Sequence, residues 1–356
     1  MTTTCIKYPS IDQFRTAIKH IKTHESFDGL DEDGKAKYKH VASYPTVEFY
    51  GTVKIHGTNA SFRQDCHDGE ILFQSRERVI DPISDNAGFA SHFYHKREQI
   101  KNMLESIRFK ALAKFNISGS PIIVVYGEWA GMGIQKGVAV NQLPKTFYVF
   151  GVKIIDGETT YHVCPGDTFF HQYVDSWNCA LTDIGIESIN RFDTFKISVD
   201  VNQPELAQNE IVQLVDQVEK CCPVGKHYGI DGIGEGIVFS CVTTPYEGLT
   251  YKCKGEKHVS SKVTTIAKVD VERIASVRDL VSVVVTENRL QQMFDSMPDH
   301  QLEQTIKNTG KFIHLVMADC FKEELDTITE NGISGKEFAA MATPVIVKFY
   351  HGKIDG

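Results

Sequence analysis

Lys54 is the residue with the clearest capacity for covalent chemistry, because a lysine amine that loses its proton can attack an electrophile. It lies in the segment Gly-Thr-Val-Lys-Ile-His-Gly-Thr-Asn at positions 51–59. Residues before it alternate between apolar and polar, which predicts a strand with Lys54 and His56 on one face. Gly57 predicts a turn where the backbone can approach a ligand closely. An exposed lysine before a hairpin would give the same short pattern, so other residues must decide.

Further segments place charged or aromatic side chains at the ends of expected strands, in an order that chance rarely produces. The segments are residues 122–136, with Glu128; 147–151, with Phe150; 234–239, with Glu235; and 251–255, with Lys252 and Lys254. Each segment alone favours a structural role: a solvated carboxylate, core aromatics or an edge strand. Their joint occurrence favours a reactive site.

A nucleophilic lysine needs neighbours of this kind. An amine with a pKa near ~10.4 is protonated at pH 7, and freeing it costs about 4.6 kcal/mol. Lys252 and Lys254 are two residues apart on one expected strand, so we expect both ammonium groups on one face. Together with burial, this positive charge is expected to lower the pKa of Lys54. The same charges can bind a phosphate and stabilise its transition state.

The remaining members of the set suit a nucleotide and a metal ion. Glu128 and Glu235 can accept a hydrogen bond from a ribose hydroxyl or bind Mg²⁺, which prefers oxygen ligands. Phe150 offers a flat surface for a purine base. The residues therefore predict a site for a nucleotide and Mg²⁺.

The elements that must position these residues change character twice along the chain. Apolar residues recur at helical spacing near the N-terminus, and residues 28–39 read as a polar loop. Short β-rich runs with helices between them follow, and from about residue 265 helical spacing returns. Strands are expected at 46–55, 70–75, 121–128, 146–155, 236–242 and 249–253, and helices at 92–115 and 203–220.

The fold class expected from this pattern is α+β, with mostly antiparallel sheets and a small all-helical C-terminal domain. The expected domains are residues 1–264 and 265–356.

Composition excludes some classes of protein. With a net charge of −8, the chain is a poor candidate for coating nucleic acid non-specifically, although a local basic groove remains compatible. The N-terminus has no signal-peptide core, and no run approaches the ~20 apolar residues of a membrane span. The nine cysteines are scattered and odd in number, which indicates free thiols in a reducing compartment. We therefore expect a cytoplasmic monomer, or one in the host cytoplasm if the protein is viral.

The sequence resembles the covalent nucleotidyltransferase superfamily of polynucleotide ligases and capping enzymes, and most closely its RNA ligase 2-like family. The matching stretches are Lys-Ile-His-Gly-Thr-Asn at 54–59, Gly-Glu-Trp-Ala-Gly-Met-Gly-Ile-Gln-Lys at 127–136, Phe-Tyr-Val-Phe at 147–150, Glu-Gly-Ile-Val at 235–238 and Lys-Cys-Lys at 252–254. The resemblance covers residues 46–262, and the helical tail agrees with it. It implies a nucleotidyltransferase domain over residues 1–264 and an RNA-end-binding role for the helical domain.

The resemblance implies an ATP-dependent RNA ligase that seals 5′-phosphate and 3′-hydroxyl ends of RNA. Lys54 would attack the α-phosphate of ATP and keep AMP, which then passes to the 5′-phosphate before the 3′-hydroxyl displaces it. Its site residues, carried over by position, are Lys54 as nucleophile, His56 assisting it, Asn59 at the RNA end, Arg76 and Glu128 on the ribose, Phe150 on adenine, Glu235 in the metal-dependent step, and Lys252 and Lys254 on the α-phosphate. One position departs from the family pattern: Val53 stands where a glutamate is frequent, which weakens any claim of side-chain readout of adenine.

Three alternatives remain open. DNA ligases and capping guanylyltransferases share the lysines and carboxylates, but they typically carry aspartate at the position of His56 and a β-barrel after the paired lysines. A non-catalytic RNA-binding relative would be expected to lose some of the reactive residues, and this chain retains them.

The segment from Gly255 to Lys262 is equally compatible with a basic lip of the site and with a solvated linker.

Overall fold

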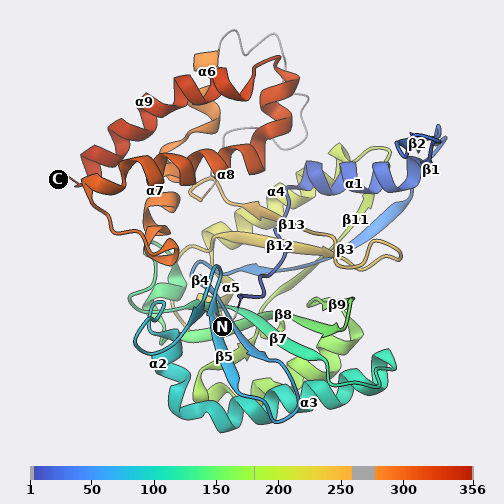
Figure 1. Cartoon of the computed structure of the whole chain (residues 1–356), viewed down its shortest axis with the longest axis vertical. Helices are drawn as coiled ribbons and strands as arrows, with labels where there is room; N and C mark the ends of the chain where they lie inside the picture. The colour runs from blue at the N-terminus through green and yellow to red at the C-terminus, as the bar shows by residue number, and fades with distance from the viewer. Residues whose placement is uncertain (1–3, 180, 259–276, 355–356) are drawn as a thin grey trace.

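The computed structural model describes residues 4–179, 181–258 and 277–354, and its elements lie in layers (Figure 1). Two β-sheets form the middle of the molecule, helices cover their outer faces, and the C-terminal helices stand beyond one of the sheets. The two sheets, their covering helices and the C-terminal helices bury three hydrophobic clusters. The α+β class with a helical C-terminal region is confirmed.

The larger sheet has seven strands in the order β10-β8-β7-β4-β5-β6, with β9 also paired to β8. Its pairs are antiparallel except β10 with β8. The bounds are β4 Thr58–Gln64, β5 Ile71–Ser75, β6 Val79–Ile80, β7 Ile122–Ala130, β8 Thr146–Asp156, β9 Thr159–Val163 and β10 Ile186–Ser188.

Helices α2 (Phe89–Phe93) and α3 (Arg97–Phe115) cover one face of this sheet, with a short 3-10 turn, η1 (Tyr94–Lys96), between them. Phe89 and Phe93 are fully buried against strand residues such as Phe62. The sequence predicted one helix over residues 92–115. The chain instead bends at Lys96, whose backbone leaves the helical region.

The smaller sheet has four strands in the order β11-β3-β12-β13, all antiparallel. Their bounds are β3 Thr46–Lys54, β11 Thr194–Asp200, β12 Gly236–Cys241 and β13 Thr250–Lys254. Helices α1 (Phe14–Ser26) and α4 (Glu205–Lys220) pack on it, and the short α5 (Pro223–His227) follows α4. The apolar stripes of α1 and α4 recur every three or four residues, which buries them against the strands.

The C-terminal part is helical throughout its described residues. It comprises α6 Val277–Val284, α7 Glu287–Asp295, α8 Thr309–Glu330 and α9 Gly335–Ile354, with the turns η7 Met297–His300 and η8 Ile306–Asn308. We call residues 277–354 the helical unit. It buries its own apolar cluster, including Phe312 and Tyr350, whose rings stack at 4.5 Å. No strand occurs within residues 277–354, so this unit is not a β-barrel.

Two further sequence predictions about elements were wrong. Residues 28–39 are not simply a loop, because β1 (Phe27–Leu30) and β2 (Ala36–Tyr38) pair there as an exposed antiparallel hairpin. Strand β4 was not anticipated, because its polar residues at 58–64 lack the expected alternation; this strand is central in the sheet and buried on both faces. The predicted domain boundary at residues 264 and 265 lies outside the described residues and stays a prediction.

None of the helices in the described ranges is both long enough and apolar enough to span a bilayer.

Gly57 lies where the chain leaves the smaller sheet after β3 and enters the larger sheet at β4. A β-carbon at this position would lie 2.4 Å from the carbonyl oxygen of Trp129 and 2.7 Å from the β-carbon of Ala130. The close approach that the sequence predicted is therefore confirmed, but the partner is the strand β7 rather than a ligand. This contact holds the two sheets together beside Lys54.

We expect Gly57→Ala to lower the free energy of unfolding by about 1–3 kcal/mol, because the added methyl group meets backbone that cannot move without separating β4 from β7. Gly310→Ala is the matched control. A β-carbon at Gly310 meets nothing within 4 Å, so this helical substitution should be neutral or slightly stabilising. Urea unfolding measures both variants, and equal stability of the two would contradict the expectation.

Candidate active site

Strand register brings the two ends of the predicted constellation together. In the smaller sheet, Gly236 of β12 pairs with Lys54 of β3 on one side and with Lys254 of β13 on the other. Glu235 directly precedes Gly236. Residues that lie 181 or more positions apart in sequence are thus neighbours across three adjacent strand ends.

Gly236 makes this arrangement possible. Its φ of +151° is rarely adopted by residues with side chains, and a β-carbon there would lie 2.0 Å from the carbonyl oxygen of Cys253. The chain turns sharply at this glycine, and the Glu235 side chain can therefore reach both flanking lysines.

The carboxylate of Glu235 is the centre of the site. It is buried, and its oxygens contact Lys54 Nζ at 2.7 Å, His56 Nδ1 at 3.2 Å and Lys254 Nζ at 3.3 Å. Burial opposes ionisation of Glu235, but the charges of Lys54 and Lys254 and the His56 hydrogen bond outweigh it, so its pKa lies well below the usual range. Glu235 is therefore an anion across the physiological range.

The pKa of Lys54 differs from the prediction. Burial lowers it, as expected, but the negative charges of Glu235 and Glu128 and the hydrogen bond to Glu235 raise it more, so the net shift is upward. The prediction that neighbouring cations and burial would lower this pKa is wrong for this arrangement of the site. Lys54 is held as an ammonium ion, and its activation requires that the contact with Glu235 weaken.

Lys254 shows the opposite balance. Its pKa is lowered because burial, with help from the charges of Lys54 and Lys252, outweighs the attraction of Glu235. Its Nζ also donates to Gln292 Oε1 of α7 at 3.0 Å. Lys252, two residues earlier, contacts a different acid, Glu323 of α8. The paired lysines are therefore close together, but each has its own carboxylate partner.

Glu128 lies near the end of β7, paired in register with Asn59 of β4. Its Oε1 accepts a hydrogen bond from the Gly57 backbone N–H at 3.1 Å. Burial raises its pKa to about 7, against the lowering effect of Lys54. Glu128 therefore exchanges a proton near neutral pH, which the sequence did not reveal.

The other predicted residues lie around this centre. Arg76 is exposed, its nearest carboxylate is that of Glu77 at 3.8 Å, and its charge acts on the pKa of Lys54. Phe150 is half-buried on β8, where its ring meets the edge of Tyr8 with centroids 5.0 Å apart. Asn59 is half-buried on β4, one residue after Thr58. The roles of all three in ligand binding stay predictions.

Sequence reasoning missed three polar residues of the site. His258 is buried, its ring lies 5.4 Å from that of His56, and burial lowers its pKa. His258 belongs to the segment from Gly255 to Lys262, for which the sequence left a basic lip and a linker open. Its place four residues after Lys254 was the only sequence signal that it lies in the site. Asp299 and Glu323 come from the helical unit and contact Thr58 and Lys252, and nothing in their sequence surroundings marks them.

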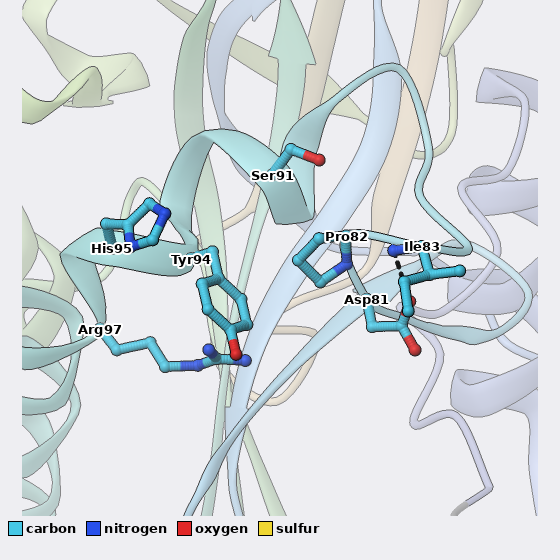
Figure 2. Close-up of a pocket in the computed structure, with 7 residues that line it drawn as sticks. All are labelled: Asp81, Pro82, Ile83, Ser91, Tyr94, His95 and Arg97. Atoms are coloured by element: carbon cyan, nitrogen blue, oxygen red, sulfur yellow. Dashed lines mark hydrogen bonds between the residues drawn. The ribbon is translucent and has the colours of Figure 1, made fainter.

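Other concave or acidic features lie away from this centre. Figure 2 shows a surface pocket of about 630 Å³ beside α2, lined by Asp81, Pro82, Ile83, Ser91, Tyr94, His95 and Arg97, none of which is a predicted site residue. Within the described ranges, a group of side chains spaced for a metal ion lies at His67, Asp68 and Glu105, and both His67 and Asp68 are exposed. No cluster of three such ligands surrounds Glu235 in the same ranges.

Comparison with known proteins gives a family match. A family model described as RNA ligase matches residues 47–269, which is more than half of the chain and includes every predicted site residue. No curated protein matches.

Solved structures similar to the chain include Naegleria gruberi RNA ligase. A lysine-to-alanine mutant with ATP and Mn has a TM-score of 0.40 at 15% identity, over 72% of this chain and 59% of that chain. The form with PPi has a TM-score of 0.39 at 15% identity, with the same coverage. The chain thus spans less than two-thirds of the length of these proteins.

The raised pKa of Glu128 has a consequence for stability. Ionising Glu128 costs free energy in the folded state. The contribution of this group to folding stability is therefore fully present below its usual pKa of 4.5 and is lost as the pH rises through about 7. We expect Glu128→Gln to become more stable relative to wild type by about 1–3 kcal/mol between pH 5 and pH 8. Urea unfolding at both pH values measures the change.

Glu158→Gln is the control for this comparison, because Glu158 lies exposed in the turn between β8 and β9. Its stability relative to wild type should be the same at pH 5 and pH 8. A Glu128→Gln variant whose relative stability does not change with pH would show that the carboxyl group ionises without cost.

Proposed function

Since the chain belongs to the RNA ligase family, we propose that it seals 5′-phosphate and 3′-hydroxyl ends of RNA with ATP, carrying AMP on Lys54. The observation that carries the proposal is the buried group formed by Lys54, His56, Glu235 and Lys254 at three adjacent strand ends. A surface lysine before a hairpin would lack these partners.

The first step forms a phosphoramidate bond. The Nζ atom of Lys54 attacks the α-phosphorus of ATP, a P–N bond forms, and the P–O bond to pyrophosphate breaks. The developing charge on the phosphate oxygens would be stabilised by Lys252 and Lys254, which lie on the adjacent strand β13. Since Lys252 contacts Glu323 in this structure, phosphate binding must compete with that contact.

Lys54 must lose a proton before it attacks. Its raised pKa depends on Glu235 and Glu128, while burial and the charge of Arg76 lower it. Any rearrangement that moves the Glu235 carboxylate away would therefore remove the strongest of the influences that keep the amine protonated. His56 shares the same Glu235 oxygen as Lys54, so it is positioned to hold that carboxylate while the amine leaves it.

The carboxylates of the site fit a divalent cation that arrives with the nucleotide. Mg²⁺ is usually bound through one or two carboxylates together with substrate phosphates. Glu235 and Glu128 offer such carboxylates, and both act electrostatically on Lys54. When bound, Mg²⁺ supplies positive charge that offsets the charge of the phosphates.

The remaining residues are assigned by their positions. Arg76 and Glu128 would contact the ribose, and Phe150 would support adenine through its half-buried ring. Asn59 would engage the 5′-phosphate end of the RNA from β4, in register with Glu128. In the second step this phosphate takes the AMP from Lys54, and in the third the 3′-hydroxyl displaces AMP and seals the strand.

We expect wild-type protein incubated with α-labelled ATP and Mg²⁺ to carry label that survives denaturation. Lys54→Ala should carry none above background, because it lacks the attacking amine. Lys37→Ala, which changes an exposed lysine on β2, is the matched control and should label like wild type. Wild type without label, or Lys54→Ala with it, would overturn the covalent mechanism, and preferential labelling by GTP would indicate capping chemistry.

The RNA assignment predicts a preference for ribose at the end that attacks. We expect nicks with a ribonucleotide at the 3′-hydroxyl side to be sealed at least about tenfold faster than nicks with deoxyribonucleotides, because the 2′-hydroxyl distinguishes the two strands. Sealing rates on two otherwise identical duplexes measure this preference. Equal rates would favour a DNA ligase.

A further inference from the structure

The helical unit contacts each of the two sheets through an acidic side chain. Glu323 of α8 accepts a hydrogen bond from Lys252 Nζ at 2.5 Å. Asp299 of η7 accepts one from Thr58 Oγ1 at 3.2 Å, beside Asn59. Both contacts join residues more than 70 positions apart. The contact with Lys252 brings a carboxylate to a place where the proposed function puts a phosphate, whereas Thr58 and Asn59 point to opposite faces of β4.

Glu323 is held firmly in this position. Its side chain is 9% exposed, and its other carboxylate oxygen accepts a hydrogen bond at 2.8 Å from Arg289, which is fully buried on α7. Burial alone would favour the neutral acid, but Lys252 and Arg289 hold the pKa of Glu323 far below its usual range. The helical unit therefore delivers a permanent negative charge to Lys252.

We propose that Glu323 competes with the α-phosphate of the nucleotide for Lys252. While the helical unit is docked, Glu323 is bound to Lys252, and nucleotide binding must displace Glu323. This inference rests on the proposed function, which assigns Lys252 to the α-phosphate. Asp299 gives the docked unit a second polar contact, at Thr58, on the face of β4 opposite Asn59. The docked helical unit thus keeps the phosphate position at Lys252 closed.

The exchange at Lys252 is physically feasible because both Lys252 and Glu323 would still contact a group of opposite charge. Removing one partner from a buried ion pair is strongly destabilising when the other is left unpaired. Here Glu323 would retain Arg289, and Lys252 would gain a phosphate oxygen. The two states therefore differ by contacts that replace one another.

Docking has its own contacts away from the phosphate positions. Arg15 of α1 donates to Glu324 Oε2 at 2.7 Å, to Thr327 Oγ1 at 2.6 Å and to the carbonyl oxygen of Glu323 at 2.8 Å. Lys19 and Asp326 form a further, exposed ion pair at 3.0 Å. Arg15 is consequently the residue through which docking can be weakened without touching Lys252.

The test measures binding of α,β-methylene-ATP with Mg²⁺ by titration calorimetry on the full chain, since this analogue is not cleaved at the α–β bridge. We expect Glu323→Gln to bind it at least about fivefold more tightly than wild type. Arg15→Ala should shift the dissociation constant in the same direction. Glu330→Gln, at the exposed end of the same helix, is the matched control and should bind like wild type.

Unchanged or weaker binding by folded Glu323→Gln would overturn the proposal, since it would mean that Glu323 supports Lys252 rather than competing for it. If this variant fails to fold because Arg289 loses its partner, the dissociation constant of Arg15→Ala decides by the same criterion. These outcomes are separate from those of the labelling experiment. Wild type that forms no lysyl-AMP contradicts the proposed function, whereas wild type that forms it with equal nucleotide affinities contradicts only the competition.

Discussion

The buried carboxylate of Glu235 is the interaction on which the rest of the site depends. A buried anion costs several kcal/mol unless cations and hydrogen bonds compensate it. Lys54, His56 and Lys254 supply that compensation from two strands of the smaller sheet and the segment that leaves it. Gly236 pairs with both Lys54 and Lys254, so the register of the sheet also decides which charges surround Glu235.

This constraint fixes the position of the nucleophile but also keeps it protonated. The same carboxylate that orients Lys54 raises its pKa, so precise placement and reactivity oppose each other in this structure. Lys252 follows the same pattern, since its partner Glu323 is also an acid. The cations of the site are satisfied internally, and phosphate groups of a substrate would have to replace these carboxylates. We therefore expect such a site to favour ligands that carry several negative charges.

The layered fold explains how distant residues meet there. The chain passes from one sheet to the other at Gly57, so Lys54 lies at the junction of the two sheets, near Glu128 of the larger one. The helical unit has its own apolar cluster, and polar and charged side chains join it to α1 and to the two sheets. Polar contacts of this kind are more easily exchanged than an apolar interface, which suits a part that must admit a substrate.

The sequence by itself determined the class of fold, the strands β3, β5, β7, β8, β12 and β13, and the inventory of reactive residues. Alternation and helical spacing are local properties, and the lysines and carboxylates stand at strand ends. Tertiary structure decided the rest. Local pattern carries no information about which acid meets which lysine. The partners of Lys252 and Lys254, the positions of His258 and Glu323, and the upward pKa shift of Lys54 therefore followed only from register and docking. Charge interactions depend on distance in space, and that distance is set by the packing of the sheets and the helical unit.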